Sequence, residues 1–65
     1  MSFKVIGYHA ITHTPTEYHN YQTRVRAEEM AKDLARMGID GEIHQCCPSK
    51  NGPHWAKISE WHWNE

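Results

Sequence analysis

The C-terminal part of the chain alternates in the way a β-strand does, and both of its faces are apolar. Alternate side chains of a strand share a face, so Trp55, Trp61 and Trp63 are predicted to point the same way from the run 54–63. The other apolar residues of the run fall on the opposite face: Ala56 and Ile58. We therefore expect one face to meet the protein's own helix and the other face to meet a partner.

The N-terminal run, residues 3–11, is rich in β-branched and aromatic residues and predicts a central strand. Residues 12–22 have no strong apolar stripe. The sequence Thr14-Pro15-Thr16-Glu17 has the form of a capping box with proline at the first helical position. We expect this segment to be a loop with at most one turn of helix.

The main helix is predicted over residues 23–37, which consist largely of good helix formers. Gly38 follows at the position where a helix commonly ends. At 3.6 residues per turn, five apolar residues fall on one stripe: Ala27, Met30, Ala31, Leu34 and Met37. This stripe is the face that we expect to pack on the sheet.

Residues 42–47 predict a second strand, and residues 48–53 predict a turn in which two prolines flank an Asn-Gly pair. Together with the tryptophan run they form a hairpin with a six-residue loop. The predicted order is strand, helix, strand, strand, with the first two strands parallel through a right-handed crossover. The fold class is α+β: a small three-stranded mixed sheet with one helix packed on one face.

A chain of 65 residues makes a single domain, residues 1–65, and buries only about 60% of its unfolded surface. Its composition, with 38% apolar and 23% charged residues, suits a folded domain. The formal net charge of −1 disfavours both a strongly basic nucleic-acid binder and an acidic DNA mimic. No run approaches the roughly 20 apolar residues of a membrane span, and the N-terminus does not resemble a signal peptide. We expect a cytoplasmic protein with no membrane partner.

The two cysteines, Cys46 and Cys47, are adjacent, which excludes a disulfide framework. Together with His44 and His54 they are of the residue types that bind zinc, and alternation places His44 and Cys46 on one strand face. The paired CxxC spacing of structural zinc sites is absent. No metal ligand is therefore assigned, and a zinc-stabilised domain stays an alternative.

A nucleophile and a base can also be named among these residues, a thiol of the cysteine pair with His44 and Glu42. On a single strand such groups do not converge on one substrate, and so small a domain offers little enclosed space. We therefore expect a protein that is not an enzyme.

The leading hypothesis is a non-enzymatic protein-binding module that uses an aromatic sheet face, for example an inhibitor of a larger cytosolic enzyme. In size and plan the chain resembles small phage-encoded proteins that bind and inactivate host enzymes, although no motif carries this resemblance. The expected contact residues are four aromatic anchors and a charged rim: Trp55, Trp61, Trp63 and Tyr8, with Lys57, Arg24 and Arg26.

Self-association through the same surface is a close variant of this hypothesis. A different alternative is binding of a small ligand, a nucleobase or single-stranded nucleic acid by aromatic stacking. The nearly neutral charge does not favour nucleic acid, because phosphate contacts normally require a basic surface.

Overall fold

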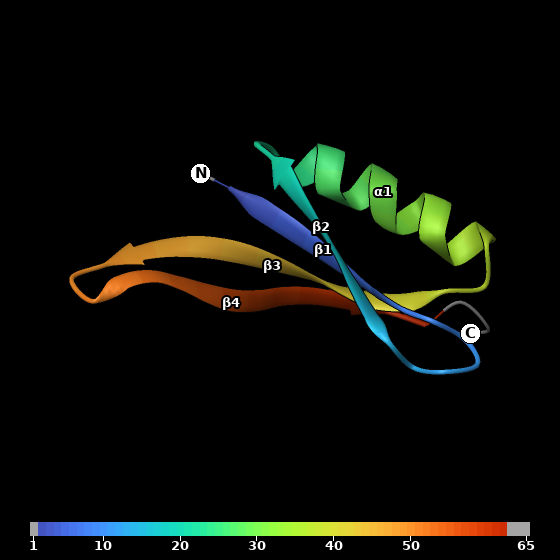
Figure 1. The fold of residues 1–65 in the computed structure, drawn as a ribbon. Coiled ribbons are helices and arrows are strands. Elements are labelled where there is room, and N and C mark those ends of the chain that lie inside the picture. The colour runs from blue at the N-terminus through green and yellow to red at the C-terminus, as the bar shows by residue number, and fades with distance from the viewer. Residues whose placement is uncertain (1, 63–65) are drawn as a thin grey trace.

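The computed structural model describes residues 2–62, which form one helix and one four-stranded sheet. Along the chain the elements are β1 (Phe3–Tyr8), β2 (Pro15–Tyr21), α1 (Arg24–Arg36), β3 (Asp40–Ser49) and β4 (Gly52–Trp61). The strands lie in the order β2-β1-β3-β4, every neighbouring pair is antiparallel, and α1 lies against one side of the sheet (Figure 1). We call the side beneath α1 the covered face and the other side the open face.

The α+β class with a single helix is confirmed for the described residues, but the three-stranded mixed sheet is wrong. The missing strand is β2, which pairs with β1 as a hairpin and returns the chain to the starting end of β1. The helix then carries the chain across the sheet, so β3 enters from the far end and runs antiparallel to β1. The order is strand, strand, helix, strand, strand.

The segment predicted as a loop is a strand because its two tyrosines face the core. Tyr18 and Tyr21 both pack against the core, although they are three residues apart. A register shift opposite Phe3 and Val5 inserts one extra residue here, and Asn20 adopts a positive φ of 77°. Such a bulge hides the two-residue alternation that identifies a strand. The capping-box interpretation of residues 14–17 is therefore wrong.

The helix was predicted within one residue at each end. The Thr23 side chain accepts a hydrogen bond from the Arg26 backbone N–H at 3.3 Å, as an N-cap does. Gly38 ends the helix with φ at 77°, the left-handed conformation that glycine adopts without strain. The predicted stripe is buried or half-buried except at its last member, Met37, whose side chain is exposed.

The core lies between α1 and the covered face of the two inner strands. Its buried members are Phe3, Val5, Ala27, Ala31, Leu34 and Ile43, with Tyr18, Tyr21, Met30, Ile39, Ile58 and Trp61 packed around them. Alanines on the inner side of α1 allow the helix to lie close to the sheet. Gly41 allows another close approach, because a Cβ atom there would lie 2.2 Å from the Ile6 carbonyl oxygen and 2.4 Å from the Trp61 ring.

The hairpin of β3 and β4 is longer than predicted, because its loop has two residues instead of six. Ser49 pairs with Gly52, which leaves only residues 50–51 in the turn. The last residue of β3 that pairs with β1 is Gln45. Beyond it the hairpin continues as two strands alone and projects past the rest of the sheet (Figure 1). We call this projecting part, residues 46–55, the arm.

Candidate functional site on the open face of the sheet

A β-bulge in β4 sends its two described tryptophans to opposite faces. Ile43 pairs with Ser59 but His44 pairs with Lys57, so Ile58 is an extra residue in β4. One extra residue reverses the alternation. Trp61 consequently packs with the core, whereas Trp55 lies on the open face. The prediction that the tryptophans share a face is wrong for these two, and Trp63 lies outside the described residues.

Trp55 is half-buried on the open face at the root of the arm. The Lys4 ammonium nitrogen lies over its ring, 4.7 Å from the ring centroid. The His19 ring meets it edge-on, with 6.1 Å between the ring centroids. A cation over an indole face and an edge-to-face ring contact are both favourable, so Trp55 is fixed by neighbours from β1 and β2.

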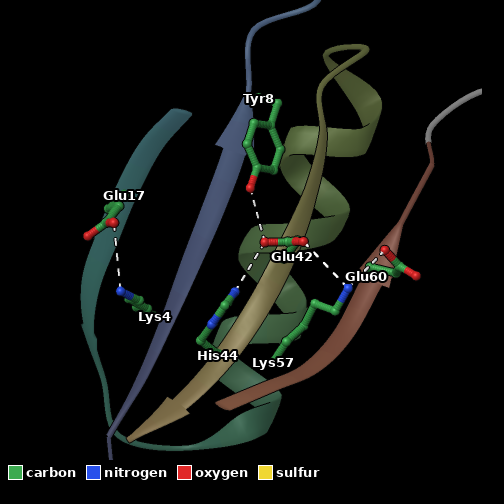
Figure 2. Close-up of polar contacts among 7 residues, drawn as sticks. All are labelled: Lys4, Tyr8, Glu17, Glu42, His44, Lys57 and Glu60. Atoms are coloured by element: carbon green, nitrogen blue, oxygen red, sulfur yellow. Dashed lines mark hydrogen bonds and ion pairs between the residues drawn. The ribbon is translucent and has the colours of Figure 1, made fainter. Parts of the chain in front are cut away.

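The centre of the open face is a polar cluster around Glu42 (Figure 2). One Glu42 carboxylate oxygen accepts hydrogen bonds from the Tyr8 hydroxyl at 3.0 Å and from the His44 ring at 3.1 Å. The other oxygen pairs with the Lys57 ammonium group at 3.7 Å, and Lys57 also pairs with Glu60 at 3.5 Å. The cluster therefore joins β1, β3 and β4.

These contacts change the acid–base behaviour of the cluster. The hydrogen bond from His44 lowers the pKa of Glu42 most, and the Tyr8 hydrogen bond and the Lys57 charge lower it further against the opposing effect of burial. The hydrogen bond between Tyr8 and Glu42 raises the pKa of Tyr8, because it favours the protonated phenol. Glu42 is thus stabilised as the anion and Tyr8 as the neutral donor.

A second, smaller cluster lies beside the first, at the edge strand β2. Glu17 accepts from the His19 ring at 2.9 Å and pairs with Lys4 at 3.7 Å. The hydrogen bond from His19 is the largest effect that lowers the pKa of Glu17, followed by the Lys4 charge. Lys4 therefore lies between Glu17 and Trp55 and links this cluster to the indole.

The open face is charged rather than apolar, which corrects the expectation of two apolar faces. Between Glu17 and Glu42 on the neighbouring strands lies one buried apolar residue, Ile6. Two lysines on this face, Lys4 and Lys57, are outnumbered by four carboxylates, so its formal net charge is −2 with neutral histidines. These carboxylates are Glu17, Asp40, Glu42 and Glu60.

The structure places three of the predicted contact residues on one face of the sheet and the others elsewhere. Tyr8, Trp55 and Lys57 lie on the open face. Arg24 and Arg26 lie on exposed parts of α1, across the sheet from these three, and pair with glutamates of the same helix. Trp61 lies on the covered face, where its indole N–H donates to the Ile39 carbonyl oxygen at 2.8 Å.

Sequence reasoning missed Lys4, Glu17, His19 and the central position of Glu42. The available signal was alternation: Lys4, Ile6 and Tyr8 occupy one side of the first strand, and Glu42 and His44 share one side of the next. What the sequence did not give is the antiparallel pairing that places these two rows side by side.

The zinc candidates are only partly brought together. His44 and Cys46 share the open face, as their spacing predicted. Cys47 and His54 are paired with each other across the arm, and their side chains lie on the opposite face. Within residues 2–62, no group of three or more histidine, cysteine or acidic side chains is arranged to hold a metal ion.

A shallow hollow of about 190 Å³ lies on the other side of the molecule, where Ala31, Lys32 and Ala35 of α1 meet Trp61 and His62. Its volume is below the range of roughly 300–1,000 Å³ that is usual for small-ligand sites. Within the described residues, no helix is long and apolar enough to span a bilayer. Comparison of the chain with protein-family models, with curated proteins and with solved structures finds no significant match.

Proposed function

We propose that this chain is a non-enzymatic protein-binding module whose contact surface is the open face of its sheet. The observation that carries the proposal is the position of Trp55. It lies half-buried on a face that no other part of the described chain covers, between Lys4 and His19. Tryptophan and tyrosine are enriched among the residues that dominate binding energies, and Tyr8 lies on the same face.

The side chains around these aromatic residues are already held in place before any partner arrives. Lys4, Glu42 and His44 have side chains that are only 12%, 23% and 18% exposed, and each is engaged by a neighbouring strand or residue. Binding to such a surface loses little side-chain entropy, which favours affinity.

The charge of the open face indicates the kind of partner. A net charge of −2 complements a basic patch on a larger protein, and such complementarity favours fast and specific association. The same charge repels a phosphate backbone, so the structure supports single-stranded nucleic acid less well. We favour one form of this function, an inhibitor whose open face covers part of the surface of a larger enzyme.

The test is capture of a partner from the native host by tagged full-length chain, repeated with Trp55→Ala. We expect the variant to lose the partner while its circular dichroism spectrum stays unchanged. Val25→Ala is the control, because Val25 is an apolar residue on α1 that is 64% exposed, and it should capture the partner normally. Full capture by Trp55→Ala would overturn the proposal.

Sedimentation of the isolated chain tests the alternative hypothesis that the partner is a second copy of this chain. A dimer that dissociates on Trp55→Ala substitution would identify the open face as a self-association surface. Trp61→Ala is unsuitable for either experiment, because Trp61 packs with the core.

A further inference from the structure

The arm is the part of the molecule that reaches furthest from the rest of the fold (Figure 1). From Gln45 to Ser49 the hairpin projects roughly 13 Å at the usual rise of a strand. Every residue from Cys47 to His54 is exposed except Gly52, which is half-exposed. A two-stranded ribbon is only marginally stable in water without support, so its persistence beyond the sheet requires a local cause.

That cause is the construction of its tip. Only Lys50 and Asn51 separate the two strands, and Gly52 follows with a positive φ of 106°, the conformation that closes such a short loop. The Ser49 hydroxyl donates to the Gly52 carbonyl oxygen across the end of the hairpin. The tip is therefore pre-ordered, which lowers the entropy lost when it enters a binding site.

The prolines of the arm restrict how a partner can bind to it. The Cys46 backbone N–H points out of the hairpin and donates to the Ser2 carbonyl oxygen at 2.8 Å. The next outward position, two residues along, is Pro48, which has no N–H, and the residue opposite is Pro53. Neither edge of the arm can extend a regular ladder with an added strand. The arm therefore offers its tip and its side chains rather than its backbone.

The charge of the arm is opposite to that of the open face. Between Gln45 and Ala56 the chain has no aspartate or glutamate, and its one formal charge is Lys50 at the tip, with His54 four residues later. A narrow, pre-ordered, cationic tip fits a concave site lined by carboxylates. One lysine is too little to neutralise the phosphates of a nucleic-acid groove.

We propose that the arm inserts its tip into an acidic cleft of a protein partner, while the open face contacts the surface beside that cleft. This inference rests on the proposed function, because Trp55 lies at the root of the arm and belongs to both surfaces. It adds to that function the shape and charge of the site on the partner.

The first test uses a photo-crosslinking amino acid in the full-length chain, placed in turn at Asn51, Glu60 and Lys32. These positions probe the tip, the open face and the helix on the other side of the sheet, and all three are exposed. We expect crosslinks to one protein from Asn51 and Glu60, and none to that protein from Lys32. The peptide joined to Asn51 should come from a cleft rich in aspartate and glutamate.

The second test uses the partner that crosslinking identifies, purified without the crosslink. Its affinity is measured for the K50E and K32E variants of this chain, two substitutions that change the net charge equally. We expect K50E to weaken binding by about tenfold or more and K32E by no more than about twofold. Equal effects of the two substitutions would overturn the insertion of the tip.

The outcomes separate this inference from the proposed function. Crosslinks from Glu60 without any from Asn51 would overturn the role of the arm and leave the open face as the binding surface. Crosslinks from neither position would overturn both. A crosslink from Asn51 to nucleic acid, abolished by nuclease, would overturn the choice of a protein cleft.

Discussion

Trp55 and Trp61 are six residues apart on the same strand, yet they have opposite environments. Trp61 packs with the core, fills the space left open by Gly41, and donates its indole N–H to a backbone carbonyl. Trp55 lies on the far side of the sheet among a lysine and a histidine ring. The comparison teaches that composition alone does not assign a role to a tryptophan. One extra residue, Ile58, makes one ring part of the core and leaves the other on the open face.

The largest expected difference between the two comes from removing each ring. Trp61→Ala should lower the free energy of unfolding by about 3–5 kcal/mol, because it removes a large side chain packed with the core. Trp55→Ala should lower it by less than about 1 kcal/mol, since the ring is held mainly by surface contacts. Urea unfolding followed by circular dichroism measures both. Equal losses would contradict the placement of Trp61 in the core and of Trp55 on the open face.

A smaller effect is expected from adding a methyl group beneath Trp61. Gly41→Ala places a Cβ atom against the Ile6 carbonyl oxygen and the indole, and overpacking of this kind costs about 1–3 kcal/mol. The matched substitution Gly52→Ala, at the tip of the arm, meets nothing within 4 Å and is strained only by its φ of 106°. It should cost about 1–2 kcal/mol. Thermal unfolding of both variants measures the difference, and a larger loss for Gly52→Ala would contradict the close packing at Gly41.

The smallest effect concerns the charge cluster of the open face and depends on pH. The pKa of Glu42 is lower in the folded protein than its ordinary value of 4.5, so the carboxylate stabilises the fold above that pH. This contribution is lost as the pH falls through the lowered pKa. For a partly exposed pair it amounts to less than about 1 kcal/mol.

Glu42→Gln should therefore flatten the loss of stability on the acidic side of pH 4.5, and it should have its largest effect on stability at neutral pH. Unfolding by urea at a series of pH values from 3 to 7 measures this. Glu29→Gln is the control, because Glu29 lies on the exposed side of α1. Parallel curves for Glu42→Gln and the unsubstituted chain would show that the cluster does not stabilise the fold.

The helix and its packing were predictable because the signals there are local. Good helix formers, an apolar stripe, and a glycine after the last turn agree with one another over residues 23–38, and nothing in the tertiary structure opposes them. The turn at Asn51 and Gly52 was likewise recognised, although its glycine closes a shorter loop than expected.

The missed strand and the wrong face for Trp61 have one physical origin, because both bulges break the two-residue period on which strand prediction depends. In β2 the extra residue places Tyr18 and Tyr21 on one face at a spacing of three, so the segment did not resemble a strand. In β4 the extra residue at Ile58 moved Trp61 to the core. A bulge is fixed by the pairing of two strands, which a single strand's sequence does not contain. Because β2 was missed, β3 was predicted to run parallel to β1, whereas the two strands are antiparallel.

The extra residue at Ile58 also affects how this protein can change over generations. Under the proposed function, substitutions around Trp55 would alter what the molecule binds, whereas substitution of Trp61 would disturb the core. Selection could then act on binding and on folding through different residues of a single strand. A lineage that needs a new target can vary the residues around Trp55 while the contacts of Trp61 stay as they are.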